Sequence, residues 1–262
     1  MRALLKLLVC EFWKLKRKKL FYISFLTTFI MPIAYAVILS ERSLDNMASV
    51  VREENGFLLL LPLSVVLAAN LFFGEHDDDT LKNLLCIPVA GGRLVMAKMT
   101  VLLLFDVGYL LASYIVGLLL VLFSGGVPAG WQKELALTFG TGILLWAASM
   151  PCILLVVWAN RSYIISVIIA FAYTVLSYIL QISDSIMMVP LGCNAQTFLP
   201  MPLIKRWLYQ YHSMEGVSEE ALAFYQRFQP YFVRTPVIFG ILGLEAVVCT
   251  ALIIRVWRRQ SV

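Results

Sequence analysis

The chain has 262 residues, of which 61% are hydrophobic and 14% are charged. Soluble domains carry about 25% charged residues, so this composition excludes an ordinary water-soluble domain. The net charge of +5 requires no nucleic acid partner, because the placement of basic residues around membrane segments accounts for it. We therefore predict an all-α membrane protein.

Six apolar stretches are each long enough to cross a bilayer as a helix. At about 1.5 Å per residue, roughly 20 residues cover a hydrocarbon core of about 30 Å. The stretches are residues 20–39, 56–73, 99–123, 135–159, 163–181 and 236–256. The first is too long for the apolar part of a signal peptide, and no small-residue cleavage site follows it, so we expect it to remain. We expect residues 1–262 to form a single transmembrane domain.

The orientation follows from the 21 Lys and Arg residues, because basic residues beside a span resist transfer across the membrane. With the N-terminus inside, 14 of them lie in the cytoplasmic segments or at the inner ends of spans, and seven lie outside. An even number of spans then places both termini in the cytoplasm. Of the five cysteines only Cys193 falls in an outer loop, so we expect no internal disulfide.

Residues 1–19 predict an amphipathic helix lying flat on the inner leaflet, ahead of the first span. On a helical wheel one side carries the apolar residues Leu4, Leu5, Leu8, Phe12 and Leu15. The opposite side carries the basic residues Arg2, Lys6, Lys14 and Arg17. A simple anchor that fixes the topology is the alternative interpretation of this helix.

Three outer segments join the spans. Residues 40–55 are short and mixed in charge, which predicts a simple external connection, and residues 124–134 contain the Gly and Pro residues of a turn. The segment 182–235 is too rich in Pro, Met and aromatic residues for a solvated linker, so we expect short helices at the outer leaflet. Within it, Ser218 is placed to cap a helix that ends near Gln229.

The cytoplasmic segment between the second and third spans, residues 74–98, carries an apolar face that lipid cannot cover. Thr80 can cap a short helix, with acidic residues before it that favour its N-terminal dipole. Leu81, Leu84 and Leu85 form a leucine face on this helix, while the charges around them hold the segment in the cytoplasm. Such a face predicts a protein partner.

This segment resembles that of the permeases of type-2 ABC exporters, the ABC-2 family. The family has an acidic residue after the second span, then Gly-Thr, a leucine-rich turn, Pro, Arg and Lys. The matching residues here are Glu75, Thr80, Leu81, Leu84, Leu85, Pro88, Arg93 and Lys98. Asp79 stands where the family usually has Gly. The resemblance implies that these residues form a coupling segment that docks on an ATPase subunit, and an interfacial N-terminal helix with six spans is also the family's layout.

The stretch from Glu11 to Arg17 is similar to the start of permeases that protect Gram-positive bacteria from lantibiotics and bacitracin. This resemblance implies an exporter in a bacterial plasma membrane that expels a peptide antibiotic. Another lipid or drug substrate of an ABC-2 permease is the alternative.

Two acidic residues lie inside predicted spans, Asp106 in the third and Glu245 in the sixth. A charge at that depth is expensive unless it is protonated, paired or facing water. Either residue is therefore a candidate for the substrate path, or it packs against a neighbouring helix. An intramembrane enzyme using both carboxylates and an ion-coupled transporter are rival classes, but the neighbours of both acids are apolar and we find no inverted repeat.

No catalytic or metal site is expected in this chain. The two histidines, His76 and His212, fall on opposite sides of the membrane in this topology. His76 stands beside three aspartates that favour a solvated acidic loop over a cation site. The chain has no Walker-type phosphate loop, so we expect ATP and Mg²⁺ on two separate ATPase subunits. The other expected partners are a second permease, identical or homologous, membrane lipid, and a peptide or lipid-like substrate.

Overall fold

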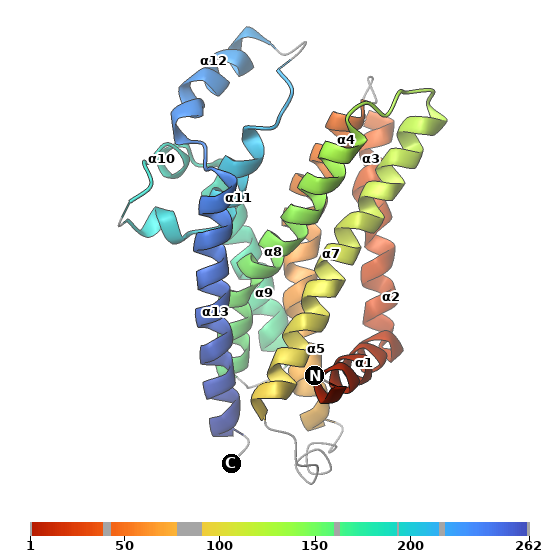
Figure 1. The fold of residues 1–262 in the computed structure, drawn as a ribbon, viewed down its shortest axis with the longest axis vertical. Helices are drawn as coiled ribbons and strands as arrows, with labels where there is room; N and C mark the ends of the chain where they lie inside the picture. The colour runs from red at the N-terminus through yellow and green to blue at the C-terminus, as the bar shows by residue number, and fades with distance from the viewer. Residues whose placement is uncertain are drawn as a thin grey trace.

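The computed structural model describes residues 2–38, 43–77, 91–159, 163–192, 194–214 and 218–260. Throughout these ranges the secondary structure is helical and no strand occurs. Six helical segments are long and apolar enough to cross a membrane, which confirms the predicted number of spans. The segments stand side by side as a bundle, and both chain ends lie at the same end of it (Figure 1).

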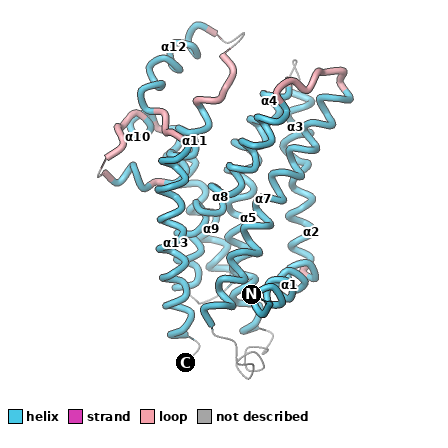
Figure 2. The backbone as a smooth tube through the Cα atoms, in the orientation of Figure 1, coloured by secondary structure: helices cyan, strands magenta, loops and turns pink. Residues whose placement is uncertain are grey.

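Helix α1 (Arg2–Arg17) crosses the foot of the bundle ahead of the first span (Figure 1). The first span consists of α2 (Lys19–Leu26), η1 (Thr27–Phe29) and α3 (Ile30–Ile38). The second span consists of α4 (Leu44–Val50), η2 (Val51–Leu60) and α5 (Leu61–Asp77). The other four are α7 (Gly91–Phe123), α8 (Trp131–Ala159), α9 (Tyr163–Ile182) and α13 (Thr235–Gln260). Between α9 and α13 lie α10 (Asp184–Met187), η3 (Ala195–Phe198), α11 (Pro200–Tyr209), α12 (Glu219–Phe228) and η4 (Gln229–Tyr231) (Figure 2).

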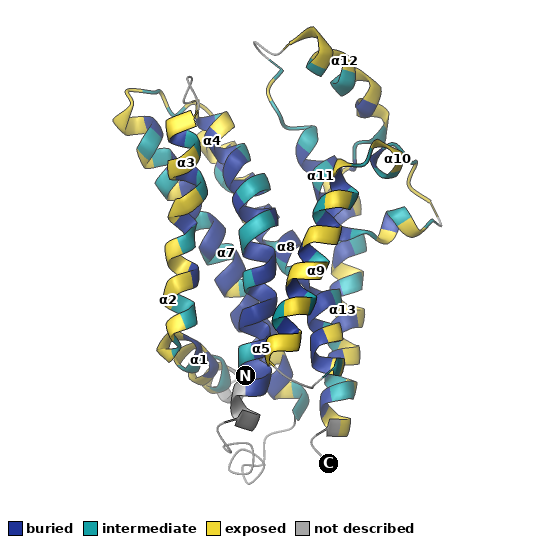
Figure 3. Cartoon of the chain, turned by 180° about the vertical axis from the view of Figure 1, so that it is seen from behind, coloured by how far each residue is buried: buried dark blue, intermediate teal, exposed yellow. Residues whose placement is uncertain are grey.

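The second span forms the centre of the bundle. In its most apolar window 78% of the residues are buried within the protein, against 22% for the first and fifth spans. Its C-terminal half, α5, packs against α7, α8 and α9. Figure 3 shows the exposed residues along α2, α3 and α9 and the buried residues on α5, α7 and α8. The outer spans therefore present apolar side chains to the surroundings, as lipid-facing helices do.

The prediction of a simple external connection at residues 40–55 is wrong for most of its length. Helix α4 begins at Leu44, capped by the Ser43 hydroxyl, which accepts a hydrogen bond from the Asn46 N–H at 3.2 Å. The second span continues from there as the π-helix η2, so Arg52 and Glu53 belong to a helix. Their charges resembled those of a solvated loop, but both residues are buried or nearly so and have partners on other helices.

The structure shows the turn and the short helices that were predicted for the other two connecting segments, while their side of the membrane stays a prediction. Residues Gly125 and Gly130, with φ of 77° and 70°, form the turn between α7 and α8 in the left-handed region that glycine tolerates. The segment after α9 forms short helices, and the Ser218 hydroxyl caps α12 by accepting from the Ala221 N–H at 3.3 Å. Helix α11 lies largely buried against α8, α9 and α13.

Candidate functional site

The predicted docking segment, residues 74–98, includes the end of α5 at Asp77 and the start of α7 at Gly91. Both helix ends lie at the end of the bundle that also carries α1 and the C-terminus (Figure 1). Thr80, Leu81, Leu84, Leu85 and Pro88, as well as the side chain of Glu75, lie outside the part that the structure describes. Their docking role therefore stays a prediction.

The two described basic residues of this segment lie in different environments. Arg93 is exposed on the first turn of α7. Lys98, less than two turns further along, has no exposed surface. Its Nζ lies 3.0 Å from Glu11 Oε2, donates to the Leu71 carbonyl at 2.5 Å, and stands over the Phe72 ring at 5.7 Å from the centroid. Lys98 thus joins α7 to α1 and α5 inside the protein.

Helix α1 packs on the bundle through part of the apolar side that was predicted to lie on the inner leaflet. Leu15 is fully buried and Leu8 packs against the core. Leu5 and Phe12 are exposed by 56% and 40%, because Glu11 occupies the middle of the packed face and pairs with Lys98. The sequence pattern located the helix but assigned its acidic residue to no partner.

Asp106 lies fully buried in the bundle, between α7 and α5. Its Oδ2 accepts a hydrogen bond from the Ser64 hydroxyl at 2.9 Å, and its Oδ1 has no hydrogen-bond partner among the described residues. No part of this side chain is exposed. The position therefore favours the packing interpretation of Asp106 over the interpretation that it lines a path.

Glu245 is partly exposed on α13, and its Oε2 is buried without a hydrogen-bond partner in the described part of the chain. Over the same part, no hydrogen bond or ion pair links Glu245 to Asp106. The described residues also contain no group of three or more His, Cys, Asp or Glu that could hold a metal. This arrangement lends no support to an enzyme that uses the two carboxylates together.

A buried polar network, which the sequence did not reveal, joins the first three spans. Pro32 has no N–H, so the Thr28 carbonyl lacks the partner that a regular helix would give it. The Ser113 hydroxyl and the Asn55 amide donate to this carbonyl instead, at 3.0 and 3.3 Å. Asn55 also donates to Ser113 Oγ at 2.5 Å and accepts from the Tyr109 hydroxyl at 3.0 Å.

The π-helical geometry of η2 accompanies this network, because Asn55 lies at the middle of that segment. Such π-helical turns are rare and frequently occur at functional positions. In the first span the 3₁₀ turn Thr27–Phe29 precedes Pro32. The two irregular helices therefore meet at one set of hydrogen bonds, and Tyr109 of α7 extends it to Thr27 at 2.9 Å.

We expect Asn55→Leu to lower the free energy of unfolding by about 2 kcal/mol, because it leaves buried polar groups with fewer partners. Tyr109→Phe removes a single hydroxyl at the edge of the same network and should cost about 1 kcal/mol. Thermal unfolding of the purified protein in detergent would compare the two variants. Equal and negligible shifts would show that the network contributes nothing to stability.

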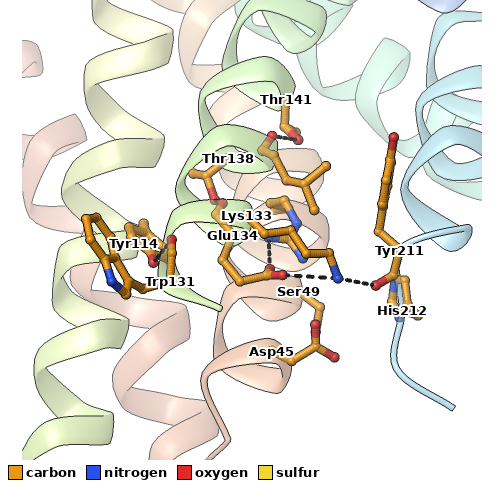
Figure 4. Close-up of polar contacts among 12 residues, drawn as sticks. Asp45, Ser49, Tyr114, Trp131, Lys133, Glu134, Thr138, Thr141, Tyr211 and His212 are labelled. Carbon is orange, nitrogen blue, oxygen red and sulfur yellow. Dashed lines mark hydrogen bonds and ion pairs between the residues drawn. The ribbon is translucent and has the colours of Figure 1, made fainter. Parts of the chain in front are cut away.

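At the opposite end of the bundle, charged residues of the second span pair with other helices. Arg52 Nη1 lies 2.5 Å from Glu134 Oε2 on α8, and both side chains are only 4% exposed. Glu53 forms an ion pair with Lys205 of α11 and contacts His212 Nε2 at 2.6 Å. Figure 4 shows the first turn of α8, where Lys133 lies between Glu134 and the Tyr211 carbonyl, to which it donates at 3.2 Å.

These contacts attach the segment between α9 and α13 to the bundle. Within this segment, α12 packs on α11 through a cluster of aromatic rings. The ring of Tyr209 packs edge-on against Phe228 at 5.3 Å between centroids and stacks on His212 at 5.0 Å. Phe224 stacks on Phe228 at 5.6 Å. Burial lowers the pKa of Arg206, which is held by a hydrogen bond from its Nε to the Tyr231 carbonyl at 2.7 Å.

The helices and their contacts define the class of protein as a multi-pass helical membrane protein with a buried central span. A family model described as ABC-2 family transporter protein matches residues 7–177, which is more than half of the chain. The chain therefore belongs to the ABC-2 family of transporter proteins. The matched part runs from α1 into α9 and contains the predicted docking segment. No curated protein gives a significant match.

Membership of this family makes the chain a membrane component of an ABC transporter that is not itself catalytic and works with ABC ATPase subunits. The outer segment and the last span lie beyond the matched residues. Their helices are consequently features of this chain for which the family match supplies no role.

Proposed function

We propose that the chain is the permease subunit of an ATP-driven exporter. Two ATPase subunits bind and hydrolyse ATP with Mg²⁺, and a second permease, identical or homologous, completes the path across a bacterial plasma membrane. The observation that carries this proposal is the family match over α1 to α9, which includes a charged segment between two apolar helices. In this orientation both termini lie in the cytoplasm, and α1 lies along the inner leaflet.

The surface of this chain that docks on the ATPase lies within residues 74–98. Its leucine face, formed by Leu81, Leu84 and Leu85, fits an apolar groove on a partner, since acidic and basic residues on either side keep it out of the lipid. Arg93 is exposed and can contact the surface of the partner. ATP-driven closure of the ATPases would displace this segment and rock the two permeases between states.

The proposed cargo is an amphipathic peptide antibiotic of the lantibiotic or bacitracin type, and a lipid or another drug is the second candidate. The support is the resemblance of residues 11–17 and the aromatic outer segment. Tyr209 and Phe224 are partly exposed and place their rings side by side at the distal end of the bundle. Such rings suit a molecule with both apolar and polar parts.

Co-purification with the ATPase subunits tests the proposal. The tagged chain should retain an ABC ATPase after extraction in mild detergent, and vesicles containing both should move the peptide only when ATP is supplied. Identification of a neighbouring gene for an ATPase would provide the partner for this experiment. A chain that transports fully when reconstituted alone would overturn the proposal.

Glu245 is the intramembrane acid that we propose lines the path, because part of its side chain is exposed. Glu245→Gln should therefore lower the transport of a cationic peptide several-fold while the yield of protein stays unchanged. Asp106→Asn is the matched control, since Asp106 is fully buried, and it should change transport less than twofold. A larger effect of Asp106→Asn than of Glu245→Gln would contradict this assignment.

A further inference from the structure

Three helices meet at one buried cation near the foot of the bundle. Lys98 of α7 has no exposed surface, and its Nζ contacts Glu11 of α1 at 3.0 Å and the Leu71 carbonyl of α5 at 2.5 Å. Glu11 is 1% exposed, and its second oxygen lies 2.7 Å from Lys14 Nζ. Leu15, one turn further along α1, is fully buried in the same contact region. We call Glu11, Lys98 and Leu71 the inner joint.

The inner joint lies close to the end of α5 and the start of α7, the two helices that the predicted docking segment connects. Leu71 precedes the end of α5 at Asp77 by six residues, and Lys98 follows the start of α7 at Gly91 by seven. At 1.5 Å per residue these separations are about 9 Å and about 10 Å along the helices. A displacement of the ends of α5 and α7 therefore reaches the inner joint within two helical turns.

We propose that Glu11 and Lys98 are positioning residues that make α1 move together with the inner ends of α5 and α7. This inference rests on the proposed function of an ATP-driven permease. The resemblance assigned Lys98 to the ATPase contact, but a fully buried ammonium group cannot reach a partner without leaving Glu11. Lys98 acts from inside the bundle, and it transmits the movement of the docking segment to α1.

A charged pair suits this role because its hydrogen bonds are short and directional. Charge-assisted hydrogen bonds fix the distance and angle between two helices more narrowly than apolar contacts do. Separation of the two buried charges would cost free energy, so the ion pair favours α1 and α7 staying together during movement. The exposed apolar residues of α1, among them Leu5, Val9 and Trp13, would then shift against the lipid as one body with α7.

The test compares transport with ATP hydrolysis in vesicles that contain the complete complex with its ATPase subunits. The double variant Glu11→Leu/Lys98→Met keeps the buried contact apolar, and its ratio of peptide transported to ATP hydrolysed should fall at least about tenfold while the ATPase remains attached. Lys98→Arg keeps a cation that can pair with Glu11 and donate to the Leu71 carbonyl, and it should retain a large part of the ratio. Lys14→Met removes the partly exposed cation from the same carboxylate and should change the ratio less than twofold.

An unchanged ratio in the apolar double variant would overturn the inference, because packing alone would then suffice. Poor insertion of the apolar variant, together with a tenfold loss of the ratio in Lys98→Arg, would overturn it as well. Failure of the proposed function looks different, since the unaltered chain would then neither retain an ATPase nor transport in response to ATP. The two failures are therefore distinguished by the unaltered chain.

Discussion

Arg52→Met is expected to lower the free energy of unfolding by about 3–5 kcal/mol, the loss typical of a buried ion pair that loses one partner. Arg52 Nη1 lies 2.5 Å from Glu134 Oε2, and neither side chain has more than 4% of its surface exposed. Without Arg52 the Glu134 carboxylate stays buried, with Lys133 3.7 Å from its other oxygen. Unfolding of the purified protein in detergent, by heat or denaturant, measures the loss.

Two further variants control for this effect. Lys133→Met removes the neighbouring cation, whose side chain is 54% exposed, and should cost less than about 1 kcal/mol because exposed ion pairs contribute little. The double variant Arg52→Met/Glu134→Leu removes both buried charges and should unfold within about 1 kcal/mol of the unaltered protein, or at higher stability. A double variant as unstable as Arg52→Met would show that the pair is not the source of the loss.

The sequence predicted the helical spans well because apolar length is a local property. Over the residues that the structure describes, each stretch that we expected to cross the membrane lies within a helical segment, with ends that differ by a few residues in most cases. The main exception is the second span, which begins at Leu44 and not near Gly56. The charges of Arg52 and Glu53 argued against a membrane span in this part of the sequence. Their partners Glu134, Lys205 and His212 become apparent only in the tertiary structure.

The same reason explains what the sequence could not show about the site. The pairing of Glu11 with Lys98 spans 87 positions in the chain, and the contact of Asn55 with Ser113 spans 58. No periodicity links residues so far apart. The sequence does contain one signal for the polar network. Pro32 inside an apolar span has no N–H, so the carbonyl of Thr28, one turn earlier, needs another hydrogen-bond donor.

The position of these buried polar contacts indicates how a displacement of the ends of α5 and α7 would be transmitted to other helices of the bundle. The inner joint links α1, α5 and α7, and the network around Asn55 links the first span, η2 and the same α7. Helix α7 thus takes part in both. Since α5 and η2 belong to one continuous span, a shift of the second and third spans would act on α1 through the inner joint and on the first span through the network around Asn55.

Leu84→Asp is expected to abolish attachment of the ATPase while the permease still inserts and accumulates normally. Placing a carboxylate in an apolar groove would weaken the contact by about 3 kcal/mol or more, which corresponds to at least about a 100-fold loss of affinity. Asn83→Asp adds the same charge on the opposite side of the predicted helix and should leave attachment within about threefold of the unaltered value. Co-purification of the ATPase with each tagged variant measures the difference. Normal attachment of Leu84→Asp, or equal loss in both variants, would contradict a docking role for the leucine face, because only the side that carries Leu81, Leu84 and Leu85 is proposed to enter the groove.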